Sequence, residues 1–88
     1  MANYVVEFTP RAKRELEKLP KLIQQRLRPR VDALAGDPRP PGVKALAGVA
    51  DRWRIRVGDY RVVYTIKDEV LLVLVLRIGH RRDVYDRL

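Results

Sequence analysis

The apolar and polar residues in the second half of the chain follow a pattern that predicts an antiparallel pair of strands. From Arg52 to Val57 the two kinds alternate strictly, which is typical of a half-buried strand. Gly58-Asp59 is a two-residue hairpin signal, and residues 60–66 are rich in β-branched and aromatic side chains. We therefore expect a β-hairpin with a two-residue loop.

The register of this hairpin determines which side chains share a face. With a loop of two residues, Arg56 faces Arg61 and Arg54 faces Val63, so these arginines and Arg52 lie on one surface. The opposite surface carries the apolar residues of both strands, Trp53, Ile55, Val57, Tyr60, Val62 and Tyr64. Because opposed like charges are destabilising, the arginine surface suggests a site for anions.

The N-terminal region predicts a strand followed by a helix. Residues 4–8 read as a short first strand. Thr9 is a good N-cap and Pro10 suits the first helical position. A helix of about ten residues is expected to follow, because apolar residues recur there at helical spacing. Its apolar positions are Ala12, Leu16 and Leu19.

A second helix is expected to begin at Pro20. It has one apolar stripe, formed by Ile23, Leu27, Val31 and Leu34. Pro29 lies inside this helix and predicts a kink or a break, because proline removes a helical hydrogen bond. Gly36, before Asp37-Pro38, is a stop signal. The two helices are expected to form an antiparallel hairpin on a sheet.

The remaining segments complete an α+β fold. Residues 43–48 suggest an edge strand or a loop, and a turn is expected at residues 67–69. Residues 70–78 are apolar at nearly every position, which favours a strand buried on both faces in the centre of the sheet. We expect one domain, residues 1–88, with an N-terminal strand and a two-helix hairpin packed on one face of a small, mainly antiparallel twisted sheet.

Composition narrows the class of partner. The 88 residues carry 19 Lys and Arg against 11 Asp and Glu, a net charge of +8, and 14 of the 19 are arginine. This balance points to nucleic acid or another acidic partner, although a solvated basic surface would give the same count. The absence of cysteine, of a signal peptide and of a membrane-length apolar run leads us to expect a cytoplasmic protein without a membrane partner.

Several kinds of catalytic site are excluded by the residues present. His80 is the only histidine and there is no cysteine, so a zinc site is not expected, and glycine-rich phosphate loops and serine nucleophiles are absent. We expect neither metal nor cofactor. RNA can be cleaved by its own 2′-hydroxyl, given a base, cations, an acid and an aromatic platform. Cations and a possible platform come from Arg56, Arg61, His80, Arg81 and Tyr85.

Three segments of this chain, KALAG, RWRIRVGDYRVVY and IGHRRDVY, together resemble the RelE branch of the RelE/ParE toxin superfamily. The resemblance covers essentially the whole chain and implies the toxin of a toxin–antitoxin pair. It further implies a metal-independent endoribonuclease that enters the ribosomal A site, contacts rRNA and cuts mRNA, thereby inhibiting translation. A cognate antitoxin would neutralise it, and the complex of the two would bind operator DNA.

The resemblance also implies roles for individual residues. Arg61 would stabilise the transition-state phosphate, Arg81 would be the general acid or a phosphate ligand, and Tyr85 would stack on or orient the substrate base. Arg54 and Arg56 occupy two positions that are lysines in the best-known members, one of them a proposed general base. An arginine is a poor base at neutral pH, so this chain departs from the family at the step of proton abstraction.

His80 is the substitute candidate for the base, because its unperturbed pKa lies near neutrality. The simpler interpretation is a turn residue bonded to the backbone, and Tyr85 could likewise only pack on the sheet. The resemblance and the surface charge together suggest a peripheral set of RNA-binding residues, Lys44, Arg52, His80 and Arg82.

Two other functions remain open from the sequence. The ParE branch shares the fold and poisons DNA gyrase without being a nuclease. Alternatively, the basic face is inactive in catalysis and only receives an acidic antitoxin segment.

Overall fold

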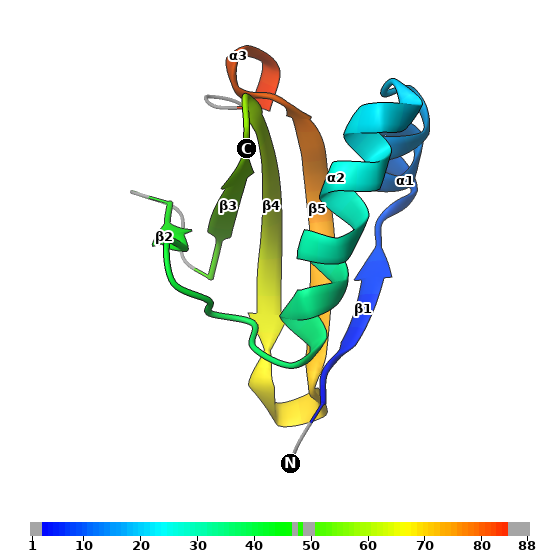
Figure 1. Ribbon diagram of the computed structural model, residues 1–88. Helices are drawn as coiled ribbons and strands as arrows, with labels where there is room; N and C mark the ends of the chain where they lie inside the picture. Colours follow the sequence, from blue (N-terminus) through cyan, green and yellow to red (C-terminus); the bar gives the residue numbers. More distant parts are fainter. Residues whose placement is uncertain (1–2, 47, 49–50, 85–88) are drawn as a thin grey trace.

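The computed structural model describes residues 3–46, 48 and 51–84, and they form a five-stranded sheet with helices on one side (Figure 1). The strands lie in the order β1-β5-β4-β3-β2. Their bounds are β1 Val5–Phe8, β2 Lys44–Ala45, β3 Trp53–Val57, β4 Tyr60–Lys67 and β5 Leu72–His80. Neighbouring strands are antiparallel except β1, which pairs in parallel with β5, so the sheet is mixed. The expected α+β class is confirmed.

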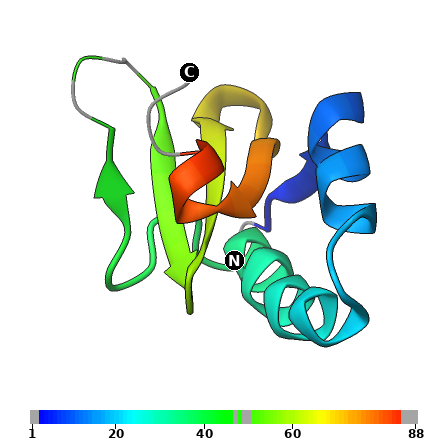
Figure 2. The same ribbon diagram turned by 90° about the horizontal axis from the view of Figure 1, so that it is seen from above.

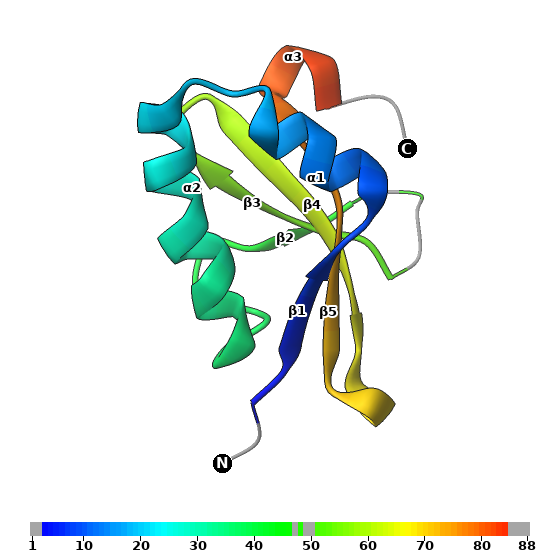
Figure 3. The same ribbon diagram turned by 90° about the vertical axis from the view of Figure 1, so that its right-hand side faces the viewer.

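Helices α1 (Pro10–Glu17) and α2 (Lys21–Asp32) follow β1 in the chain. Helix α2 lies along one face of the sheet, and α1 packs beside β5 near the end of β1 (Figures 2 and 3). Two short 3₁₀ turns, η1 (Ala33–Ala35) and η2 (Asp68–Val70), and a final short helix, α3 (Arg81–Val84), complete the described elements.

The hydrophobic core lies between the two helices and the facing surface of the sheet. The helices contribute Ala12, Leu16, Leu27 and Val31, and η1 contributes Leu34. The sheet contributes Ile55, Val62, Tyr64, Ile66, Val73, Val75 and Ile78. The apolar surface predicted for the hairpin is therefore the core-facing one, and the arginine surface is the opposite face.

The β3–β4 hairpin has the predicted register. Arg56 pairs with Arg61 and Arg54 pairs with Val63. Gly58 has a φ of 63°, a left-handed conformation that glycine adopts without steric cost and that a two-residue hairpin turn requires. Because the turn is short, it fixes the pairing along the whole hairpin.

The predicted start of α1 is confirmed, since the Thr9 hydroxyl accepts a hydrogen bond from the Ala12 N–H and Pro10 is the first helical residue. A break at Pro29 was one of two expected outcomes, and it is wrong, since α2 runs unbroken from Lys21 to Asp32. Pro29 is exposed and lies in the last turn, so the helix loses one hydrogen bond at a position where water can replace it. Gly36 does not end α2, which ends four residues earlier and continues into η1.

The expectation that residues 70–78 form the central strand is also wrong. β4 lies at the centre, and all of its residues from Arg61 to Ile66 are buried. On β5, Leu72, Leu74 and Leu76 are only half-buried. β5 is covered on its outer edge by the short strand β1, whose pairing ends at Phe8 opposite Val75.

Candidate functional site

The face of the sheet that points away from the helices carries two rows of cationic residues. In one row, Arg56 on β3 lies opposite Arg61 on β4, whose other neighbour is Gly79 on β5. In the next row, Arg54 on β3 pairs with Lys44 on β2. Four predicted site residues are thereby brought onto one face by strand register alone. Like charges repel at this spacing, so the opposed arginines lower stability unless their charge is balanced.

The cations of this face differ in their exposure. Arg56 and Lys44 are exposed, Arg54 is half-buried, and Arg61 is only 8% exposed. The Nη1 atom of Arg54 is buried and donates no hydrogen bond to any residue that the structure describes. A guanidinium N–H in this state costs free energy that a bound oxyanion would recover.

Arg81 is brought to the same end of the sheet by its backbone. Its N–H donates a 2.9 Å hydrogen bond to the carbonyl oxygen of Asp59, in the loop that joins Arg56 and Arg61. The Arg81 side chain is exposed, and so is that of Arg82. Arg52 immediately precedes β3 and is half-buried. Tyr85 lies outside the described residues.

His80 lies on the other side of the sheet from the arginines. It pairs with Tyr60, and the two rings meet edge to face with centroids 5.6 Å apart. Its Nδ1 accepts a 3.3 Å hydrogen bond from the Arg82 N–H. The geometry favours the turn-residue interpretation and gives no support to His80 as the base.

Two charged residues near the face were not picked out as site residues from the sequence. Arg77 on β5 lies opposite Val63, is only 6% exposed and binds the carboxylate of Glu15 on α1, with 3.1 Å between Nε and Oε2. A single arginine inside an apolar run was the available signal, because a buried cation needs a counter-charge. The sequence does not identify Glu15 as the partner of Arg77, because the two residues are distant along the chain.

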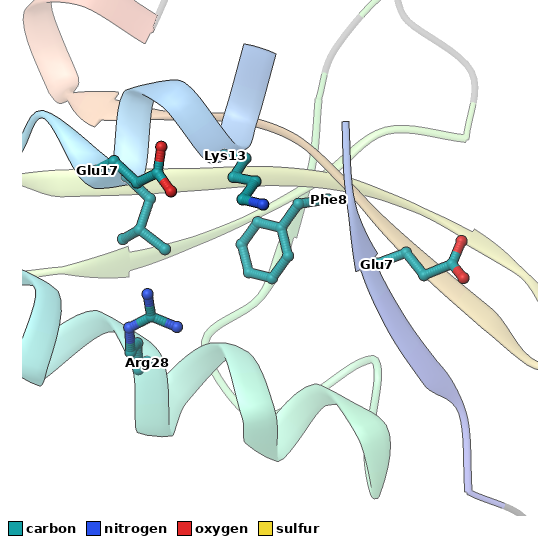
Figure 4. Close-up of a pocket in the computed structure, with 6 residues that line it drawn as sticks. Glu7, Phe8, Lys13, Glu17 and Arg28 are labelled. Atoms are coloured by element: carbon teal, nitrogen blue, oxygen red, sulfur yellow. The ribbon is translucent and has the colours of Figure 1, made fainter. Parts of the chain in front are cut away.

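Two pockets that are lined by described residues lie on the helix side. One of about 410 Å³ lies between β1, α1 and α2, where Lys13, Glu17 and Arg28 surround the ring of Phe8 (Figure 4). The carboxylate of Glu7 points away from that ring (Figure 4). Another, of about 250 Å³, is lined by Tyr60 and His80. Both pockets are lined by cations and carboxylates together. Neither therefore has the concentration of positive charge that the arginine face offers to a polyanion.

Within the described part of the chain, no cluster of three or more histidine or acidic side chains is arranged to hold a metal ion. No described helix is long and apolar enough to cross a membrane.

Residues 6–85 match the family model described as the ParE toxin of the type II toxin–antitoxin system parDE. The chain belongs to this toxin family. The match includes β1, both long helices, the arginine face and the region of Arg81, so the face described above is part of the family domain.

Relatives within the family carry RelE-type names. Toxin RelG of Mycobacterium tuberculosis is 35% identical over 96% of this chain and 98% of its own length. The mRNA interferase toxin RelE of Escherichia coli is 31% identical over 93% of this chain and 90% of its own.

Solved structures give the same picture of the fold. The toxin–antitoxin complex RelBE2 from Mycobacterium tuberculosis contains a chain that matches with a TM-score of 0.80 and 35% identity, covering 91% of this chain and 100% of that one. The isolated E. coli RelE toxin matches with a TM-score of 0.78 and 30% identity, covering 88% of this chain and 83% of that one. This member of the ParE toxin family therefore has the RelE fold, which confirms the resemblance found in the sequence.

Proposed function

We propose that this toxin is a ribosome-dependent endoribonuclease that cleaves mRNA in the A site without a metal ion. The observation that carries the proposal is the arginine face, on which Arg56 and Arg61 are directly opposed and the Arg54 Nη1 is buried without a hydrogen-bond partner among the described residues. The E. coli relative named mRNA interferase supports the reaction type. Contact of the toxin with the ribosome and with rRNA is part of the proposal.

The proposed reaction is an internal transesterification of RNA. The 2′-oxygen attacks the adjacent phosphorus, the bond to the 5′-oxygen breaks, and the products are a 2′,3′-cyclic phosphate and a 5′-hydroxyl. One proton leaves the 2′-hydroxyl and one joins the departing oxygen. Negative charge builds up on the phosphorane, and fixed cations stabilise it more than they stabilise the substrate.

The face supplies these cations. Arg61 is held rigidly by its burial in β4 and would bind the phosphorane, while Arg81 would bind the same phosphate or protonate the 5′-oxygen. Arg54 and Arg56 would act as phosphate ligands and not as bases, because guanidinium stays protonated at neutral pH. Tyr85 would hold a substrate base, and Lys44, Arg52 and Arg82 would contact the flanking RNA backbone.

Cleavage of A-site codons on programmed ribosomes tests the proposal. Primer extension should map cuts within the A-site codon in the presence of EDTA-treated toxin, and the downstream fragment should carry a 5′-hydroxyl. Arg61→Ala should slow cleavage by about 100- to 1,000-fold, the effect of losing one preorganised charge donor.

The matched control is Arg26→Ala, because Arg26 is an exposed arginine of α2 on the far side of the sheet. It should leave the cleavage rate unchanged. Intact A-site codons with the wild-type toxin, or cutting at the normal rate by Arg61→Ala, would rule the proposal out.

An antitoxin is the expected protein partner, since structural relatives were solved as toxin–antitoxin complexes. Operator DNA would be bound only by the complex with the antitoxin.

Gyrase inhibition is the second candidate function, favoured by the ParE name of the matching family model. A DNA supercoiling assay with purified gyrase separates the two. We expect supercoiling to proceed normally in the presence of this toxin.

A further inference from the structure

The outer edge of β5 is completed by α1 where β1 ends. Strand pairing stops at Phe8 opposite Val75. Beyond it, the Thr9 N–H donates to the Val75 carbonyl at 3.0 Å and the Thr9 hydroxyl donates to the Leu76 carbonyl at 3.2 Å. The Ile78 N–H then donates to the Glu15 carboxylate at 2.9 Å. Glu15 thus takes the place of a strand at this edge.

The same carboxylate neutralises a buried cation. Arg77 Nε lies 3.1 Å from one Glu15 oxygen and 3.4 Å from the other. Arg77 lies opposite Val63, and Arg61 lies opposite Gly79, so the two buried arginines are diagonal neighbours on the arginine face. Diagonal neighbours are roughly 7–8 Å apart, close enough for like charges to repel in a poorly solvated site.

Both effects act on the segment that leads to Arg81. Ile78 is followed by Gly79, the neighbour of Arg61, and then by His80 and the start of α3. A displacement of this edge would move Arg81 and the cross-strand neighbour of Arg61 together. Reaction rates depend steeply on such displacements, because a misplacement of about 1 Å can cost about 100-fold.

We propose that Glu15 is a positioning residue of the cleavage site, which acts by capping the edge of β5 and by balancing the charge of Arg77. The proposal rests on the proposed endoribonuclease function. Glu15 lies on the helix side and touches no reacting atom, so its effect is indirect.

Three variants separate the two actions. Glu15→Ala removes both the acceptor for the Ile78 N–H and the counter-charge of Arg77. Glu15→Gln keeps an amide oxygen for the Ile78 N–H but removes the negative charge that Glu15 places beside Arg77. Glu17→Gln is the control, because Glu17 is an exposed glutamate on the same helix. Among the described residues, only its backbone carbonyl accepts a hydrogen bond, and its carboxylate accepts none.

Steady-state cleavage kinetics on programmed ribosomes should show an effect on kcat and not on KM. We expect Glu15→Ala to lower kcat by about 10- to 100-fold with KM within about threefold. Glu15→Gln should lower kcat by about tenfold, and adding Arg77→Met to it should restore kcat, because the cation whose charge balance Glu15→Gln disturbs is then gone. Glu17→Gln should match the wild type. A normal kcat in Glu15→Ala, or no rescue by Arg77→Met, overturns the proposal.

Amide hydrogen exchange provides a readout that does not depend on cleavage. In Glu15→Ala the Ile78 amide should exchange at least tenfold faster, while the Val73 amide, which lies in the part of β5 paired with β1, keeps its rate. Glu15→Gln should keep the Ile78 amide slow. If the wild-type toxin cuts no RNA, the proposed function is wrong. Unchanged exchange of the Ile78 amide in Glu15→Ala would instead show that Glu15 does not cap the edge of β5, whatever the result of the cleavage assay.

Discussion

At the scale of single residues, the arginine face has features that lower stability and that the proposed RNA binding would offset. Arg54 keeps one guanidinium nitrogen buried with no partner in the described chain, beside a pair of directly opposed arginines. Each of these features costs free energy in the unliganded protein. Such costs are typical of functional sites, because a residue chosen only for stability would avoid them.

Replacing Arg54 should therefore affect stability and function in opposite directions. Arg54→Met keeps the aliphatic stem and removes the unpartnered N–H groups, so we expect the free energy of unfolding to rise by about 1 kcal/mol. RNA cleavage should fall at least tenfold. Urea unfolding and the ribosome assay measure the two quantities.

Arg56→Met is the matched control, because Arg56 lies on the same strand with an exposed side chain. Its unfolding free energy should stay within about 0.5 kcal/mol of the wild type. A loss of stability in Arg54→Met larger than that of Arg56→Met would contradict the assignment of Arg54 as a strained ligand.

At the scale of elements, side chains of the sheet hold the loop between η1 and β2. The Tyr64 hydroxyl, fully buried in β4, donates a 2.7 Å hydrogen bond to the Pro38 carbonyl. Arg39 lies over the Trp53 ring, 5.3 Å from its centroid, and binds Asp68 at 2.9 Å. Asp68 also accepts a hydrogen bond from Tyr4. The loop is therefore attached to the core, to β3 and to the turn before β5.

The buried Tyr64 hydroxyl should make the free energy of unfolding fall at alkaline pH. Burial raises the pKa of this hydroxyl from 10.0 to about 12. Its contribution to stability is full below pH 10 and is lost as pH rises toward 12, up to about 3 kcal/mol. Tyr64→Phe should be less stable at pH 7, by about 1 kcal/mol for the unpaired Pro38 carbonyl, and should lose less stability between pH 10 and 12. Equal slopes of unfolding free energy against pH would disprove this role.

The Asp68 carboxylate should make the free energy of unfolding fall at acid pH. Hydrogen bonds from Arg39 first, and from Tyr4, lower the pKa of the Asp68 carboxyl below its usual 3.8. The stabilisation that Asp68 provides is present above pH 3.8 and is lost as pH falls through its lowered pKa. Asp68→Asn should therefore flatten the acid limb of an unfolding curve. An acid limb as steep as that of the wild type would show that the attachment of the loop does not depend on this charge.

The elements also show which parts of the fold can be predicted from the sequence. The register of β3 and β4 was predictable because a two-residue turn fixes it locally, and Thr9 and Pro10 define the start of α1 for the same reason. The position of β5 in the sheet was not predictable, because strand order depends on the pairing of β1 with β5, a segment far away in sequence. The Glu15–Arg77 pair is equally non-local, because its members are separated by 62 positions in sequence.

At the scale of the whole molecule, positive charge lies on both sides of the sheet. Arg54, Arg56 and Arg61 lie on the arginine face, and α2 exposes Arg26 and Arg30 on the helix side. The overall charge alone therefore does not locate an RNA site. The arginine face differs from the helices in that its cations are opposed across a rigid sheet.

Salt dependence distinguishes the two sides. Binding of single-stranded RNA weakens with salt by a slope of roughly 0.7 per phosphate contact in logarithmic units. The double variant Arg54→Met with Arg56→Met should reduce this slope by about 1.4. The double variant Arg26→Met with Arg30→Met removes the same charge from α2 and should leave the slope unchanged. Equal reductions would mean that the helices bind RNA as strongly as the sheet.

The parallel pairing of β1 with β5 has a consequence for the order of synthesis and folding. Val5 pairs with Leu72, so β1 has no place in the sheet until the chain has been made as far as β5. Closing so long a loop is slow compared with forming the local β3–β4 hairpin. Nascent chains that lack β5 also lack the Arg61–Gly79 row and the start of α3. The cleavage proposed for this toxin therefore requires a chain that has been made past β5.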